Sequence, residues 1–283
     1  IVVTAPPPPG SGGDVMLRQV RTALNTASGN QTITQVSFGG VTPSSVRFIV
    51  TAATADGTAA DGELFCYGAA AGGAQWAASM AAEHGVADTN AARMWTDSAC
   101  LLLIDANGNE VMRGTFVEFT TNGVTVNLAW SGAAAAYLVT AIFGGGTKYE
   151  AWVGSVPLGD VGDVANVACD FAADVVRGVA TWGGRDVGES GGTLSLGMAH
   201  RDGPQYVLER SYADGLTDAQ NRMRLFEGSV FHCRYNTPAR GEVSVLSWSG
   251  SGFSVKVATG AFNSTGLLMA ERFGDVGSRL ALV

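Results

Sequence analysis

The sequence predicts an all-β protein made of two tandem, duplicated antiparallel β-sandwich domains of jelly-roll type. Three observations predict it. Landmarks near the N-terminus recur about 130 positions later, short strand-like runs alternate with turn residues throughout, and 283 residues suffice for two domains. Many short strands at regular spacing are typical of sandwiches and jelly rolls.

The repeat is an ordered set of landmarks, and it is too long to be a solenoid unit of 20–50 residues. The matched landmarks are Val46-Arg47 with Val176-Arg177, Gly68 with Gly197, Gln75-Trp76 with Gln205-Tyr206, Asn122 to Val126 with Ser251 to Val255, and Leu138 with Phe143-Gly144 against Leu268 with Phe273-Gly274. Loop insertions and deletions explain why the shift varies by a few residues. The sequence therefore predicts two copies of one domain.

Strands are expected where β-branched, aliphatic and aromatic residues cluster between Gly, Asp, Asn or Ser. In the first copy these runs are 46–51, 64–67, 100–104, 124–130 and 136–142, and in the second they are 175–181, 193–196, 229–233, 243–248, 253–257 and 267–270. Two segments, 73–85 and 205–214, have a more irregular composition. We expect them to be the long loops of the two copies.

The domain boundaries follow from glycine and proline. Residues 1–13 contain Pro6 to Pro9 and a Gly-Ser-Gly-Gly segment, which predicts a stiff and then flexible N-terminal arm. Such an arm either lies along a neighbouring subunit or is a plain linker. Three glycines, 144–146, mark the joint, so the first copy is expected over 14–146 and the second over 147–283, packed side by side.

Charge and apolar runs restrict the partners. The net charge is −8, and the Lys and Arg residues form no cluster, which disfavours nucleic acid and anionic membranes. No apolar run reaches the roughly 18 residues of a membrane span. The four cysteines, Cys66, Cys100, Cys169 and Cys233, lack C-x-x-C spacing and are expected to be buried free thiols rather than disulfides or metal ligands.

The residue patterns that carry catalysis are missing from the sequence. None of the three histidines, His84, His200 and His232, lies within four residues of another, and His232 is expected on a strand face. The segment Asp105 to Glu110 resembles a calcium loop, but Asn107-Gly108 between two apolar runs favours a tight hairpin. We therefore expect no enzyme activity, no catalytic residue, no cofactor and no metal.

Aromatic residues are the remaining candidates for contact with a ligand or partner. Trp76, its counterpart Tyr206, and Trp95 lie in regions expected to be loops, where exposed rings could stack on sugars. Three other tryptophans, Trp130, Trp152 and Trp248, end or occupy expected strands and are assigned to the core or an interface. A glycan-binding, lectin-like module is thus the alternative function.

Each copy resembles a β-sandwich repeat of tailed-bacteriophage virion proteins. The elements that carry this resemblance are Ser28 to Thr34 as a turn, Phe38 to Phe48 leading into a strand, Thr54 to Gly57, Leu64 to Gly68, Asn122 to Trp130, and Ala136 to Val139 with Phe143-Gly-Gly145. The first copy matches the pattern closely. In the second copy the position of Pro43 falls in a deletion and Thr259 replaces Trp130.

The resemblance implies a structural role and transfers no catalytic residue. It implies a virion component, a tail-fibre, baseplate or capsid-surface decoration protein, located in the extracellular particle. Expected partners are other virion proteins, further copies of the chain in a homo-oligomer and a host-surface glycan.

Overall fold

The computed structural model describes residues 15–57, 63–83, 90–181, 183–212, 222–234, 240–260 and 264–274. Regular structure in them is β-strand apart from one 3-10 turn, Val36–Phe38, so these residues contain no helix long and apolar enough to cross a membrane. The predicted all-β antiparallel fold is confirmed. The arm expected over 1–13 lies outside the described residues.

The first half of the chain forms a large and a small sheet. The large sheet has the order β1-β10-β3-β4-β5-β6, and the small sheet has the order β2-β9-β8-β7. Their strands are β1 Met16–Ala23, β2 Gly29–Thr34, β3 Ser45–Thr51, β4 Glu63–Ala71, β5 Ala74–Ala82, β6 Ala91–Thr96, β7 Leu101–Ile104, β8 Glu110–Thr120, β9 Gly123–Trp130 and β10 Leu138–Gly145.

The second half repeats this strand order. Its large sheet is β11-β21-β13-β15-β16-β17 and its small sheet is β12-β20-β19-β18, while the short β14 joins the large sheet of the first half beside β6. The strands are β11 Glu150–Leu158, β12 Val164–Ala168, β13 Val175–Thr181, β14 Glu189–Ser190, β15 Gly192–His200, β16 Gln205–Tyr212, β17 Arg222–Glu227, β18 Phe231–Arg234, β19 Arg240–Trp248, β20 Gly252–Thr259 and β21 Ser264–Arg272. Common ancestry of the halves stays a prediction, but their strands correspond one to one.

Two glycines at corresponding positions have the same structural role. A Cβ atom on Gly68 in β4 would collide with the carbonyl oxygen of Cys100, and one on Gly197 in β15 would collide with the carbonyl oxygen of Val230. Each glycine therefore permits the chain entering the small sheet to pass directly over the large sheet.

Two glutamines at corresponding positions also have one role. The Gln75 side chain accepts a hydrogen bond from the Phe116 N–H at 2.8 Å, and the Gln205 side chain accepts one from the Val245 N–H at 2.7 Å. Both donating N–H groups lie at a β-bulge, in β8 and β19 respectively. The glutamines satisfy backbone groups that the bulges release from the strand ladder.

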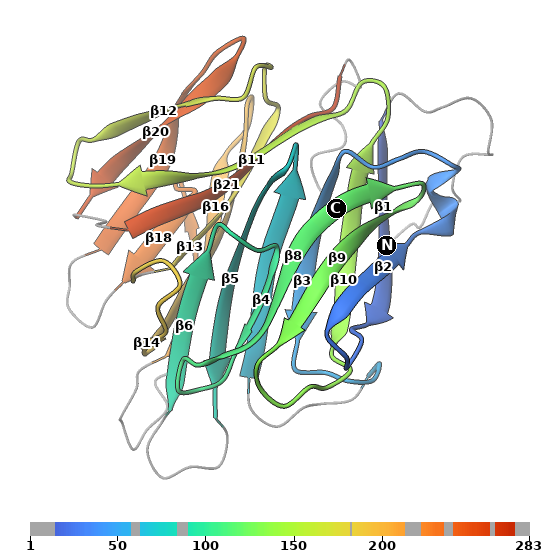
Figure 1. The fold of residues 1–283 in the computed structure, drawn as a ribbon. Coiled ribbons are helices and arrows are strands. Elements are labelled where there is room, and N and C mark those ends of the chain that lie inside the picture. Colours follow the sequence, from blue (N-terminus) through green and yellow to red (C-terminus); the bar gives the residue numbers. More distant parts are fainter. Residues whose placement is uncertain are drawn as a thin grey trace.

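The four sheets stack as four layers, with the two large sheets in the middle (Figure 1). One apolar core lies between the large and small sheets of each half, and a third apolar cluster joins the two large sheets. Strands β11 and β21 run across β4 and β5 in Figure 1, so the halves meet through crossed sheet faces.

The prediction that 73–85 and 205–214 are long loops is wrong for the residues of these segments that the structure describes. The first contains β5, Ala74–Ala82, and the second contains β16, Gln205–Tyr212. Residues of β5 from Trp76 to Ala81 are all buried, because sheets cover both of its faces. This strand consequently lacks the alternation of polar and apolar residues that marks a half-exposed strand.

Two further sequence expectations need correction. The segment Ser28 to Thr34, expected to be a turn, contains strand β2. The prediction that Phe143 matches Phe273 is wrong by three residues. Val46 and Val176 correspond to each other, and their partners on the neighbouring strand are Phe143 and Ala270. Phe143 therefore corresponds to Ala270 and not to Phe273.

Other expectations are confirmed. Asn107 and Gly108 lie in the turn of the β7–β8 hairpin, where the Asp105 carboxylate accepts the N–H groups of Asn107 and Asn109. Partial burial opposes ionisation of Asp105, but the hydrogen bonds from the turn hold its pKa below the ordinary value. The described cysteine side chains, Cys66, Cys100 and Cys169, are buried free thiols, and the side chain of Cys233 lies outside the described set.

Candidate functional site

An apolar cluster between the two large sheets forms the junction of the halves. The first half contributes Ala69, Ala71, Trp76, Ala78, Met80 and Trp95, and the second contributes Val153, Val179, Leu194, Leu267 and Met269. Small alanine side chains on β4 and β5 let the sheets approach, while the two tryptophans fill the space between them. We call this contact the junction.

Trp76 and Trp95 are anchors of the junction and not exposed loop residues, so the expectation of a surface ligand contact is wrong for both. Trp76 is fully buried, stacks on Tyr67 and donates its indole N–H to the Leu268 carbonyl at 2.9 Å. Trp95 is 6% exposed and donates its indole N–H to the Gly183 carbonyl at 2.9 Å. Their partner is the second half of the same chain.

Tyr206 occupies the position in the second half that corresponds to Trp76. It pairs with Met198 across β15 and β16, as Trp76 pairs with Ala69 across β4 and β5. Unlike Trp76, it is 37% exposed. The structure therefore does not bring Tyr206 together with the two tryptophans, and its contact with a ligand or partner stays a prediction.

A buried charged group adds a polar contact to the junction. The Glu271 carboxylate, at the end of β21, accepts the Arg177 Nε–H at 2.7 Å and the Tyr149 hydroxyl at 2.7 Å. Arg47 of the first half lies 3.9 Å from the same carboxylate, and Ser45 contacts the Tyr149 hydroxyl. Arg47 and Arg177 occupy corresponding positions of the two halves, so both halves converge on one acid.

The two arginines keep Glu271 ionised although it is buried. Burial alone favours the neutral acid, but the positive charges of Arg47 and Arg177 and the Tyr149 hydrogen bond hold the Glu271 pKa below its ordinary value. Burial and the negative charge of Glu271 raise the Tyr149 pKa well above its ordinary value. The group ties the halves together, and its full burial leaves no path for a ligand.

A segment of the second half extends the large sheet of the first. In β14, Glu189 pairs with Arg93 and Ser190 pairs with Ala92, which covers the edge of β6. The Arg93 guanidinium also donates to the Ser190 carbonyl at 2.7 Å and lies 3.2 Å from the Glu189 carboxylate. Strand addition of this kind covers an edge that could otherwise pair with another chain.

An ion pair holds the same segment against the small sheet. Arg113 of β8 donates to Asp186 at 2.8 Å and also to the Glu110 carboxylate. Hydrogen bonds that Arg113 donates to Glu110 and Asp186 raise the Arg113 pKa, with Glu110 making the larger contribution. Partial burial opposes ionisation of Asp186, but Arg113 and neighbouring groups lower its pKa.

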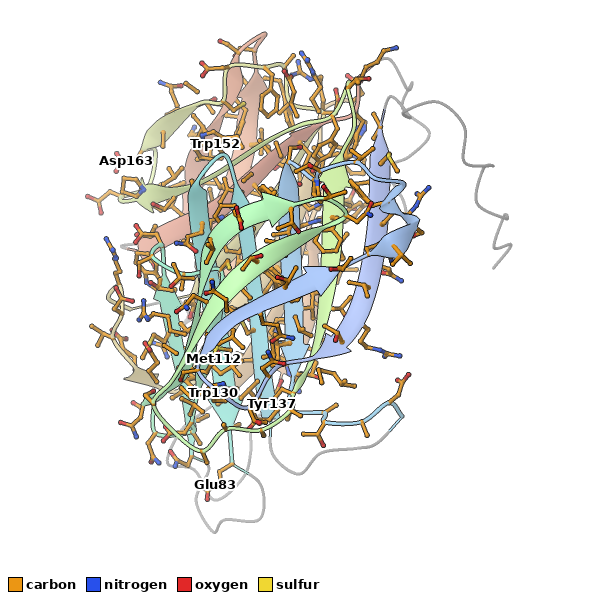
Figure 2. All side chains as sticks on the ribbon, turned by 45° about the vertical axis from the view of Figure 1, so that its right-hand side comes forward. Glu83, Met112, Trp130, Tyr137, Trp152 and Asp163 are labelled. Atoms are coloured by element: carbon orange, nitrogen blue, oxygen red, sulfur yellow. The ribbon has the colours of Figure 1, made fainter. Side chains whose placement is uncertain are left out.

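A hollow at one end of the first sandwich is a separate candidate for ligand contact. It has a volume of about 570 Å³, and its lining includes Glu63, Glu83, Asp105, Asn107 and Tyr137. Figure 2 shows Glu83, Tyr137 and Trp130 at this end of the molecule. Carboxylates, amides and an aromatic ring together suit hydrogen bonding to, and stacking on, a hydroxylated ligand.

Little in the sequence indicates this hollow, since its residues come from turns and strand ends far apart in the chain. Tyr137 stacks on Trp130 with ring centroids 6.3 Å apart, just before β10 begins. Burial raises the Glu63 pKa, although the nearby Arg210 opposes this effect. Among the residues that the structure describes, no group of three or more His, Cys, Asp or Glu side chains could hold a metal ion.

His232 forms a buried pair in the second sandwich. Its ring contacts the Glu209 carboxylate and stacks on Phe226 at 3.7 Å between centroids. Both His232 and Glu209 are fully buried between the large and small sheets. The expectation that His232 lies on a strand face is confirmed, and its surroundings make it part of the core.

No protein-family model matches the chain, and no curated protein matches it.

Proposed function

We propose that this chain is a non-enzymatic structural component of a tailed-bacteriophage virion, such as a tail-fibre, baseplate or capsid-surface protein. The observation that supports this most directly is the junction, where buried aromatic anchors, a shared charged group and a donated strand join two similar sandwiches. A unit built in this way presents sheet faces and edges in a fixed relation, as a component of a regular particle must.

The resemblance of both copies to virion repeats supports the same proposal. The two strand orders correspond throughout, and glycine and glutamine recur where the shared geometry requires them. In this proposal most of the buried polar groups stabilise the fold.

The test is whether the chain is incorporated into particles. Phage particles from the source culture are purified by density gradient, and the chain is quantified by mass spectrometry and located by antibody labelling in electron micrographs. We expect multiple copies per particle at one defined position. Recovery of the chain only in the particle-free fraction would contradict the proposal.

A glycan-binding, lectin-like role is the second candidate, and the hollow beside Tyr137 favours it. Its polar lining and its adjoining aromatic pair fit a sugar ring better than the buried junction does. Tyr206 remains the other candidate contact.

Binding to bacterial surface polysaccharides by titration calorimetry separates these possibilities. If the hollow is the site, Tyr137→Ala weakens binding at least about tenfold and Tyr206→Ala leaves it unchanged. The reverse result assigns the contact to Tyr206. Absence of heat with every polysaccharide rejects the lectin-like role.

A further inference from the structure

The outer face of β16 and β17 carries an exposed apolar strip. Leu208 pairs with Leu225 and Arg210 pairs with Met223 across these strands, so Tyr206, Leu208, Met223 and Leu225 lie on one face, together with Arg210, which is ion-paired with Glu63 of the first half. Met223 is 62% exposed and Leu225 is 71% exposed. We call these four residues the β16–β17 strip.

The strip corresponds to the part of the first half that the junction covers. Ala78 pairs with Trp95 and Met80 pairs with Arg93 across β5 and β6, in the same register as the pairs of the strip. The corresponding residues are Trp76 and Tyr206, Ala78 and Leu208, Trp95 and Leu225, and Arg93 and Met223. The first member of each pair is buried, whereas the strip stands largely open.

The chain itself shows what covers such a face. On the first half the cover is formed by β11, β21, β13 and β15 of the following sandwich. The corresponding strands of the first half, β1, β10 and β3, are covered by the second half only at one end, through Leu17 and Arg47, and the rest of their outer face mixes polar and apolar residues. Arg21 of β1, Ile49 of β3 and Thr140 of β10 line an open hollow there, and Arg21 is exposed.

We propose that the β16–β17 strip is the docking site for the β1-β10-β3 face of a second copy of this chain. The contact continues the junction from one copy to the next, head to tail. Because the two surfaces differ, such association does not stop at a dimer and yields a ring or a filament. The inference deepens the proposed assembly role and rests on it.

The edge of β17 is also consistent with docking of a second copy at the β16–β17 strip. Within the described part of the chain β17 pairs only with β16, whereas the corresponding β6 is covered by β14. Exposed strand edges pair readily with another chain.

The polar contacts of the junction are not reproduced at the strip. At the position that corresponds to Arg93, the second half has Met223. At the position that corresponds to Arg113, which lies three residues before the bulge of β8, the second half has Glu242, three residues before the bulge of β19. The docking of a second copy therefore combines the apolar side chains of the strip with a face that includes Arg21 and Thr140. We expect association to be concentration-dependent.

Sedimentation over a concentration series tests the proposal, with Leu225→Glu on the strip and Leu246→Glu as the matched control. Leu246 is a second exposed strand leucine, located on β19. Wild type and Leu246→Glu should show mass rising with concentration beyond a dimer, while Leu225→Glu requires at least about tenfold higher concentration. Met223→Glu serves as the second strip variant if Leu225→Glu does not fold, as judged by circular dichroism.

Mixing shows whether the contact is head to tail. Thr140→Glu blocks the β10 face, so neither it nor Leu225→Glu should associate alone. An equimolar mixture should form a complex of two chains and no larger one, because one intact strip meets one intact β1-β10-β3 face. A wild type that stays monomeric throughout, or equal behaviour of Leu225→Glu and Leu246→Glu, overturns the inference.

Particle incorporation distinguishes this inference from the proposed function. If Leu225→Glu enters particles as well as wild type does, the head-to-tail contact is wrong while the virion role stands. If wild type itself is absent from particles, the virion role fails independently of association in solution.

Discussion

Single glycines determine how closely the large and small sheets approach in each half. Gly68 and Gly197 lie directly beneath the carbonyl oxygens of Cys100 and Val230, where any side chain would overlap backbone atoms. Backbone cannot move aside as a flexible side chain can. These positions are therefore fixed by contact and not by an unusual backbone conformation.

Replacement of either glycine by alanine should destabilise the protein. We expect Gly68→Ala and Gly197→Ala each to lower the free energy of unfolding by at least about 1–3 kcal/mol, because the added methyl overpacks the core. Gly250→Ala is the control, since a Cβ atom added there would meet no atom within 4 Å. Denaturant unfolding measures all three, and equal midpoints for Gly68→Ala and Gly250→Ala would contradict this view of the fold.

Glu271 makes the stability of the junction depend on pH. Its folded-state pKa lies below the ordinary value of 4.5, so its contribution to stability is fully present above that value. The contribution decreases as the pH falls below 4.5 and through the folded-state pKa, because the unfolded chain then binds the proton more tightly.

Glu271→Gln should lower the free energy of unfolding by about 3–5 kcal/mol near neutral pH, since Arg47 and Arg177 lose their buried counter-charge. The difference from wild type should shrink in acid. Thermal unfolding from pH 7 to pH 3 measures this, with the exposed Glu118→Gln as control. A constant difference across that range would show that Glu271 is not ionised in the folded protein.

At the scale of strands, the sequence predicts those rich in β-branched, aliphatic and aromatic residues and misses β5, whose composition is different. The run 46–51 is rich in β-branched and aromatic residues and forms β3. By contrast, β5 is rich in alanine, which has low strand propensity, and tertiary packing overrides that propensity. One of its two covering layers comes from the second half of the chain, which no local pattern reveals.

The bulges of β8 and β19 depend on glutamines from neighbouring sheets. Gln75→Met keeps the side-chain volume but leaves the Phe116 N–H without its acceptor. We expect a loss of about 1–3 kcal/mol in unfolding free energy and faster amide exchange at Phe116. Gln19→Met, at an exposed position, is the control. Unchanged exchange at Phe116 would show that the bulge does not need Gln75.

At the scale of the whole molecule, the sequence predicts two similar halves but not how they meet. Because their segments lack a strand pattern, Trp76 and Trp95 are predicted on the surface, yet both are buried at the junction. The repeat predicts that Trp76 and Tyr206 correspond, but only the three-dimensional arrangement shows that Trp76 is covered and Tyr206 is exposed.

The junction should make the two halves unfold together. Trp76→Ala removes an anchor shared by both large sheets, so we expect a loss of about 3–5 kcal/mol and separation of one calorimetric transition into two. Trp248→Ala is the control, because Trp248 packs within the second half only. That variant should shift a single transition, and the same behaviour from both variants would contradict coupling through the junction.

One kind of contact joins half to half within the chain and, as we infer, chain to chain within an assembly. A reconstruction of the assembly by electron cryomicroscopy tests this directly. We expect each sandwich to be related to the next by the same rotation and translation, with the β16–β17 strip covered by β1, β10 and β3 of the following copy. A strip that is open to solvent, or covered by a different surface, would contradict the shared contact.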